Sequence, residues 1–205
     1  MDVFWQQTIN GLTVGGIYAL IALGYTMVYG VLRLINFAHG DLSVLGAYIG
    51  LVVLGGGVGA GGTQTWLVVL AFVAAIVVVG LAGAVLEFTA YRPLRKADRL
   101  AAVVSALGAS LLIENGIMLI WGPQLRVFPQ GLLPSGAWEV AGTRIDLLQL
   151  LIIGGSALLM AVLYLFVHHT RFGTAMRAAA IDQDAARLMG INVNRVITSV
   201  FVIGP

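Results

Sequence analysis

Residues 170–195, TRFGTAMRAAAIDQDAARLMGINVNR, form the longest polar, helix-patterned segment of the sequence, and strongly apolar sequence lies on both sides of it. A loop between two membrane spans needs only a few residues to turn round, whereas this one uses about twenty-five, rich in Arg, Asp, Ala and Gly. The length and the pattern predict a short helical hairpin that docks onto another protein. The alternative is a solvated loop whose arginines only fix the topology.

Local signals predict each part of this hairpin. Gly173 is expected to break the preceding span, and the alanine-rich residues 174–181 favour a first helix. Asp182 is expected to cap a second helix over residues 183–189. Gly190 then supplies the left-handed residue that ends this helix.

One side of the hairpin is predicted to be a small apolar ridge. Four side chains at spacings of three and four residues would form it: Ala178, Ile181, Ala185 and Leu188. Arg177 and Arg187 flank the ridge. Such a surface fits a groove on a partner protein.

The composition is that of an integral membrane protein. The chain is 60% hydrophobic and only 10% charged, compared with about 25% charged residues in soluble domains. The net charge of +2 does not indicate a nucleic-acid partner, because the basic residues sort by loop as topology requires. The absence of cysteine excludes disulfides and thiolate metal sites. The N-terminal MDVFWQQTIN lacks the basic start of a signal peptide, so the first apolar run is expected to be a retained span.

Six spans are predicted, and the last of them is incomplete. Uncharged runs of about twenty residues are long enough to cross the bilayer. The runs are residues 11–32, a second ending near Gly55, 66–86, 101–121, 147–167, and a sixth that begins at Val196 and stops at Pro205. We therefore expect an all-α polytopic bundle, a single domain over residues 1–205 that is C-terminally incomplete. Residues 87–99 form a charged loop, and residues 122–146 an extracytoplasmic loop with a short interfacial segment.

The second span begins in a polar region. The uncharged residues 42–86 are split by GGGVGAGGTQT at 55–65, and a helix starting at Leu42 would measure only about 21 Å. We expect the helix to begin near Leu34, which places Asn36, His39 and Asp41 inside the membrane edge as candidates for lining a translocation pathway. The alternative is that Asp41 caps the helix and His39 lies among the headgroups.

Glu114 is the one acid well inside a predicted span. An ionised carboxylate there costs a few kcal/mol unless it has a partner. Glu114 is therefore expected to be protonated, bonded to Asn115 or a neighbouring helix, or in contact with a pathway.

The basic residues predict the orientation. Nine lie on one side of the alternating spans, namely Arg33, Arg92, Arg95, Lys96, Arg99, Arg171, Arg177, Arg187 and Arg195, and only Arg126 and Arg144 lie on the other. By the positive-inside rule the side with nine is the cytoplasm, and the N-terminus is outside.

Motifs for chemistry are missing from the sequence. It contains no GxxxxGK[ST] phosphate-binding loop and no GxSxG nucleophile motif, and its three histidines have no metal-site spacing. We expect a polytopic helical membrane protein that is not an enzyme and itself binds no cofactor or metal.

Two stretches resemble a known family. GGIYALIALGYTMVYGVLRLINFAHGDLSVLGAYIG, residues 15–50, resembles the start of the permease subunits of branched-chain amino acid ABC importers, and RAAAIDQDAARLMGINVNRV, residues 177–196, resembles their cytoplasmic loop. The resemblance covers essentially the whole chain, which looks like the N-terminal two-thirds of such a subunit.

The resemblance implies a mechanism. The loop would form coupling helices that sit in a cleft on an ATP-binding cassette ATPase, which uses ATP and Mg²⁺ to rock the permease between its inward and outward states. The residues implied are Gly173, Arg177, Ala180, Asp182, Ala185, Arg187 and Gly190, with Ala178, Ala179 and Ala186 also allowing close packing. A second related permease subunit, an extracytoplasmic amino-acid-binding protein and membrane lipid complete the implied partners. The setting would be a bacterial cytoplasmic (inner) membrane.

Two other transport functions stay open. Permeases for urea or short amides look similar at this level. An ion-coupled secondary carrier could use Glu114 and Asp41, although it would not need the long docking loop.

Overall fold

The structure is a computed structural model that describes residues 2–56, 65–95, 97–124, 126–128, 136–140 and 143–205. Its elements in chain order are α1 (Asp2–Leu32), α2 (His39–Gly56), α3 (Thr65–Leu86), the π-helical turn η1 (Glu87–Tyr91), α4 (Arg99–Trp121), β1 (Ala137–Val140), β2 (Thr143–Asp146), α5 (Leu147–His169), α6 (Arg171–Ile181), α7 (Gln183–Leu188) and α8 (Val193–Ile203). The expected all-α bundle is confirmed. The short antiparallel hairpin β1–β2, within the predicted loop 122–146, is its only sheet among the described residues.

Among the described residues, four helices are long and apolar enough to cross a membrane, by length and composition: Val3–Leu32, Trp66–Tyr91, Leu100–Trp121 and Leu147–His169. The remaining two predicted spans correspond to α2 and α8, which are shorter apolar helices. Most of the glycine-rich turn predicted at 55–65 falls on residues 57–64, outside the described residues.

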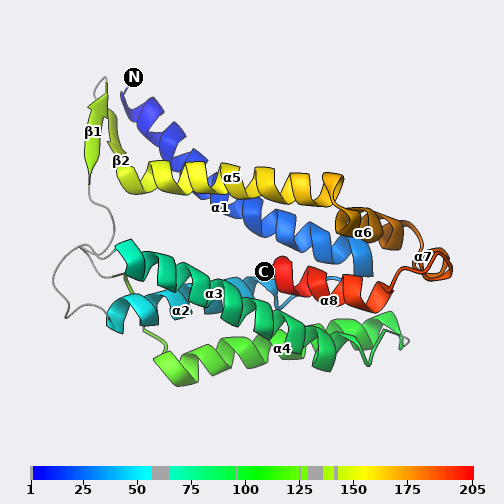
Figure 1. Ribbon diagram of the computed structural model, residues 1–205. Helices are drawn as coiled ribbons and strands as arrows, with labels where there is room; N and C mark the ends of the chain where they lie inside the picture. The colour runs from blue at the N-terminus through cyan, green and yellow to red at the C-terminus, as the bar shows by residue number, and fades with distance from the viewer. Residues whose placement is uncertain (1, 57–64, 96, 125, 129–135, 141–142) are drawn as a thin grey trace.

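The helices form two groups with α8 between them (Figure 1). α1 and α5 pack together on one side, α2 and α3 pack together on the other, and α4 lies against α2 and η1. α6 and α7 lie at one end of the bundle, whereas the N-terminus and the β-hairpin lie at the opposite end. The fold therefore places the predicted docking segment at the end where α1, α5 and η1 also finish.

α8 is the centre of the core. Val196, Ile197, Val200 and Phe201 are buried against α1, α3 and η1, where the Phe201 ring lies 4.9 Å from that of Tyr91. Between membrane helices such packing stabilises through close van der Waals contact, because lipid tails are as apolar as these side chains. α8 thus ties the two helix groups together.

Two glycines allow α8 to approach its neighbours this closely. A Cβ on Gly24 of α1 would lie 1.9 Å from the carbonyl oxygen of Gly204, and a Cβ on Gly83 of α3 would lie 2.0 Å from that of Phe201. Any larger residue at these positions would push α8 away.

Three predicted boundaries differ from the structure by about five residues or more. α1 begins at Asp2 and not near residue 11, so its N-terminal end extends well past the apolar run. α2 begins at His39 and not near Leu34, because Arg33 takes a positive φ of 55° and ends α1, and residues 33–38 are not helical. α3 continues through η1 to Tyr91, so the first five residues of the predicted loop 87–99 are helical, and the helix ends only before Pro93.

Candidate docking site

The α6–α7 hairpin is built from local caps. The hydroxyl oxygen of Thr170 accepts a hydrogen bond from the Gly173 amide and begins α6. The Asp182 carboxylate accepts hydrogen bonds from the amides of Asp184 and Ala185, at 2.8 and 3.1 Å, and begins α7. These two bonds lower the pKa of Asp182, that of Ala185 contributing most. The predicted cap at Asp182 is confirmed.

Gly190 ends α7 as predicted. It has φ +83°, a conformation that side-chain-bearing residues avoid, and its amide donates to the Arg187 carbonyl at 3.0 Å. Met189 is the C-cap, so α7 ends at Leu188, one residue earlier than predicted.

Gly173 does not break a helix, contrary to the prediction. It lies inside α6 and is buried, and the break falls at Thr170, between α5 and α6. A Cβ at Gly173 would lie 2.2 Å from the carbonyl oxygen of Val167 and 2.6 Å from that of Phe166. The residue is glycine because α6 folds tightly against the end of α5.

The outer side of the hairpin presents large apolar side chains to solvent. Ile181 is 78% exposed, Leu188 88% and Met189 82%. Together with the exposed Ala185 they form what we call the docking face. The prediction that Ile181, Ala185 and Leu188 are presented to a partner agrees with their exposure. The prediction did not include Met189, which is also exposed.

Part of the predicted ridge faces inward. Ala178 packs against the core, and Ala179 and Ala186 are buried, so these three alanines serve packing within the chain. Arg187 lies on the exposed side, where it pairs with Asp184 at 2.8 Å. Exposed pairs of this kind contribute at most about 1 kcal/mol.

The inner side of the hairpin is joined to α1 and α5. The Arg33 guanidinium donates to the carbonyls of Ala180 and Ile181, at 3.2 and 3.1 Å, where a cation is favourable at the C-terminus of α6. The Gln183 side-chain amide donates to the Val31 carbonyl at 2.8 Å. The Arg177 guanidinium donates to the Val167 carbonyl of α5 at 2.8 Å. The hairpin is thus fixed to the ends of two membrane-spanning helices.

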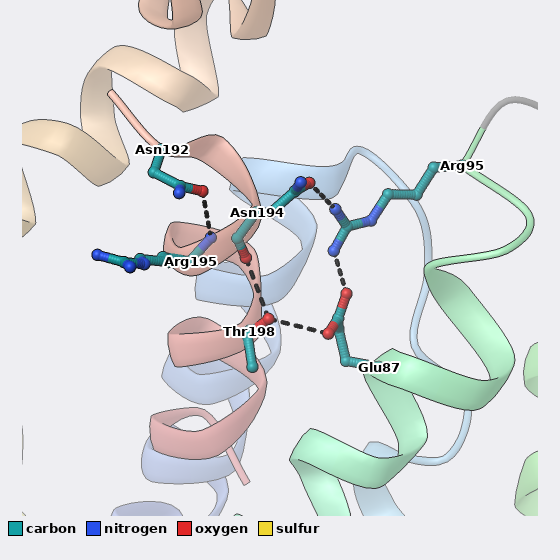
Figure 2. Close-up of polar contacts among 6 residues, drawn as sticks. All are labelled: Glu87, Arg95, Asn192, Asn194, Arg195 and Thr198. Atoms are coloured by element: carbon teal, nitrogen blue, oxygen red, sulfur yellow. Dashed lines mark hydrogen bonds and ion pairs between the residues drawn. The ribbon is translucent and has the colours of Figure 1, made fainter. Parts of the chain in front are cut away.

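A buried polar cluster joins α8 to η1 (Figure 2). Glu87, only 1% exposed, pairs with Arg95 and accepts a hydrogen bond from the Thr198 hydroxyl at 2.9 Å. Arg95 also donates to the Asn194 side chain at 2.7 Å. We call Glu87, Arg95, Asn194 and Thr198 the Glu87 cluster. Burial lowers the pKa of Arg95, and the Glu87 carboxylate opposes this shift.

Sequence reasoning missed the Glu87 cluster because its members are far apart in the chain. Figure 2 shows Arg95 and Glu87 facing α8, whereas the Arg195 side chain points away from them. One signal was present: Glu87 is the acid that directly follows the uncharged run 42–86. A charge at the end of a span, with basic residues just beyond it, indicates a buried ion pair.

The polar residues around the start of α2 are in contact with protein. Asn36 is buried and accepts a hydrogen bond from the Tyr91 hydroxyl at 3.0 Å. His39 is buried, with its Nε2 3.2 Å from the Ile21 carbonyl. Asp41 accepts a hydrogen bond from Ser110 of α4. The three side chains join α2 and its preceding segment to α1, η1 and α4.

Glu114 lies apart from these residues. It is on the exposed side of α4, and the neighbouring Asn115 donates to the Leu111 carbonyl at 2.7 Å and not to Glu114. An acid on the outer side of an apolar helix requires a polar partner in a membrane. Within the described residues, no three His, Asp or Glu side chains form a group that could bind a metal.

Comparisons with known proteins agree with this architecture. A family described as "Branched-chain amino acid transport system / permease component" matches residues 7–204. The chain is 40% identical to the high-affinity branched-chain amino acid transport system permease protein LivH of Salmonella typhimurium, 41% to LivH of Escherichia coli K12 and 42% to BraD of Pseudomonas aeruginosa. Each match covers 98% of this chain and 67% of the relative. No solved structure matches the chain.

Proposed function

The chain belongs to the family of permease components of branched-chain amino acid transport systems, and we propose that it forms the transmembrane pathway of an ATP-driven importer of these amino acids. The observation that carries the mechanism is the docking face on the α6–α7 hairpin. Three large apolar side chains, Ile181, Leu188 and Met189, are exposed there on a hairpin joined to the membrane-spanning helices. Apolar side chains grouped in this way favour a protein partner.

An ATP-binding cassette ATPase is the partner we assign to the docking face. ATP and Mg²⁺ would bind to that subunit, and this chain would bind no cofactor. The coupling residues would be Gly173, Arg177, Ala180, Asp182, Ala185, Arg187 and Gly190. Four of these residues are exposed, namely Arg177, Asp182, Ala185 and Arg187, while Gly173 and Gly190 fix the backbone.

Movement of the hairpin would reach the membrane through three contacts. Arg33 and Gln183 join the hairpin to the end of α1, and Arg177 joins it to the end of α5. A rigid-body shift of the docked ATPase would therefore move α1 and α5.

The orientation and the remaining partners complete the proposal. In a bacterial cytoplasmic membrane, the hairpin would lie in the cytoplasm and the N-terminus outside, as the distribution of basic residues favours. A second related permease would complete the pathway, and an extracytoplasmic amino-acid-binding protein would deliver the substrate to the outer end.

Asn36, His39, Asp41 and Glu114 are proposed to line or border the pathway. Glu114 gives the clearest test of this proposal, because its side chain lies on the exposed side of α4. We expect Glu114→Gln to reduce leucine uptake while leaving membrane assembly unchanged. Normal uptake in this variant would show that the carboxylate is not part of the pathway.

A pull-down with an uptake assay tests the docking role. Leu188→Asp places a charge on the docking face, and the matched control Val127→Asp changes an exposed valine in the segment that follows α4. Loss of one central apolar contact costs about 2 kcal/mol or more, so ATPase retention by Leu188→Asp should fall about thirtyfold. The control should retain the ATPase.

The pull-down and the uptake assay also distinguish the ATP-driven importer from the alternative functions. An ATPase that co-purifies equally with both variants would overturn the docking role. A secondary carrier would be indicated by two results together: uptake stops when the proton gradient is dissipated, and it is unchanged by a mutation in the phosphate-binding loop of the ATPase. Uptake of urea without leucine would indicate an amide permease.

A further inference from the structure

A groove of about 460 Å³ lies between α1, α5 and α6, on the inner side of the hairpin. Its volume is in the range of ligand pockets, about 300–1,000 Å³. The walls are mainly apolar side chains: Leu23 and Met27 of α1, Met160 and Leu163 of α5, and Met176 of α6. Such walls offer almost no hydrogen-bonding partners, which favours a hydrocarbon chain over a peptide segment.

The groove has the depth of one membrane leaflet. It extends along α1 from Leu23 to Val31, eight residues or about 12 Å. Half of the hydrocarbon core measures about 15 Å. Its other end lies at His168 near the C-terminus of α5, and the end of a membrane-spanning helix is expected at the headgroup region.

Arg177 gives this end of the groove a positive charge. Arg177 and His168 line the groove, and no carboxylate does so among the described residues. The Arg177 guanidinium has a fixed position because it donates to the Val167 carbonyl. A basic group at the headgroup end of an apolar groove between membrane helices matches an anionic lipid.

We propose that this groove binds one anionic phospholipid, with an acyl chain between α1 and α5 and the phosphate beside Arg177 and His168. The lipid would contact the inner side of α6, directly behind the docking face. Its binding would stabilise the position of the hairpin relative to α1 and α5.

Native mass spectrometry of the full chain in mild detergent tests this site. The protein is titrated with dioleoyl-phosphatidylglycerol and, separately, with dioleoyl-phosphatidylcholine. We expect one tightly bound phosphatidylglycerol per chain and weaker binding of the zwitterionic lipid. Equal binding of both lipids would overturn the proposal.

Two variants with matched controls locate the lipid. Gly30 lines the groove and has open space where a Cβ would lie, so Gly30→Leu should fold and fill the groove. Gly15→Leu is its control, because Gly15 also has open space and lies on α1 outside the groove. We expect Gly30→Leu to weaken phosphatidylglycerol binding at least about tenfold, since the added side chain would clash with an acyl chain. Unchanged binding in Gly30→Leu would overturn the proposal.

The charge is tested in the same way. Arg177→Gln should weaken phosphatidylglycerol binding about fivefold, the effect of one basic group near an anionic lipid. Arg195→Gln removes an exposed arginine outside the groove and should leave binding unchanged. If both variants weaken binding equally, the attraction comes from the overall charge and not from this site. The readout is lipid binding, so it does not depend on transport or on the ATPase.

Discussion

The α6–α7 hairpin and the α1–α2 junction at residues 33–38 are neighbours, joined where Arg33 donates to the carbonyls of Ala180 and Ile181, yet different forces determine their conformations. The hairpin follows local rules, since residues within a few positions of one another cap both of its helices. The junction is irregular and depends on distant partners, as in the bond from Tyr91 to Asn36. The comparison shows that a segment exposed to a partner can be specified by its own sequence, whereas irregular backbone beside a membrane needs the surrounding protein.

The Glu87 cluster belongs with the junction in this comparison. Its ion pair joins η1 to the following loop, and Thr198 comes from α8, 111 residues away in sequence. Such a contact can form only after the helices have packed. If the comparison is right, variants in the cluster should affect the whole molecule, and variants in the hairpin should act locally.

The largest effect is expected for Arg95→Ala. The substitution leaves the Glu87 carboxylate buried without its cation, which should lower the free energy of unfolding by about 3–5 kcal/mol. Steric trapping or denaturant titration in detergent would measure it. Arg92→Ala is the control, because Arg92 is exposed and its guanidinium lies over the Phe88 ring, a contribution of about 0.5–1 kcal/mol. Equal losses in the two variants would mean that the cluster does not hold the helices together.

Gly173→Ala should have the second largest effect. The added methyl group would meet the backbone oxygens of Val167 and Phe166, so the α5–α6 corner must open, at a cost of about 1–3 kcal/mol. The melting temperature in detergent measures the change. Gly116→Ala is the control, because the space around Gly116 is open and alanine favours a helix. A melting temperature unchanged in Gly173→Ala would contradict the close approach of α6 to α5.

Features that depend only on residues close in the sequence could be predicted from the sequence alone. The long spans could be predicted because an uncharged run of sufficient length has few alternatives to a membrane helix. Asp182 and Gly190 were predicted because a cap needs only the residues beside it. The exposure of Ile181 and Leu188 followed from the helical spacing.

Features that depend on distant contacts could not be predicted. Gly173 has the sequence signature of a helix break, and only the approach of α5 shows that it is a packing position. The π-helical turn at Glu87–Tyr91 has no local signature, and its buried acid is stabilised by Arg95 and Thr198. The start of α2 at His39 follows the irregular junction at residues 33–38, which distant contacts such as the bond from Tyr91 to Asn36 hold in place.

Gly190→Ala tests whether the α6–α7 hairpin is specified by its own local sequence. A Cβ in the left-handed conformation costs about 1–2 kcal/mol, so the end of α7 should fray while the rest of the bundle keeps its stability. Hydrogen exchange at the amides of Met189 and Ile191, which donate to carbonyls of α7, would report the fraying. Gly190→Asn should preserve most of the protection, since asparagine tolerates this conformation. A fall in the melting temperature as large as that of Arg95→Ala would make the hairpin part of the global fold.

The smallest effect is expected from the cap at Asp182, and its pH dependence gives the finest test. Hydrogen bonds from the amides of Ala185 and Asp184 lower the pKa of this carboxyl below its ordinary value of 3.8. A lowered pKa means that the cap contributes fully above pH 3.8 and is lost as the pH falls through the lowered value. Protection of the two amides, corrected for intrinsic exchange, should therefore stay constant from neutral pH to about pH 4 and fall only below it. Asp182→Asn should keep the cap without this acid transition, whereas Asp182→Ala should lack the protection at every pH. Loss of protection near pH 6 in the wild-type chain would instead mean that a distant titrating group controls α7, and the hairpin would no longer be a locally specified element.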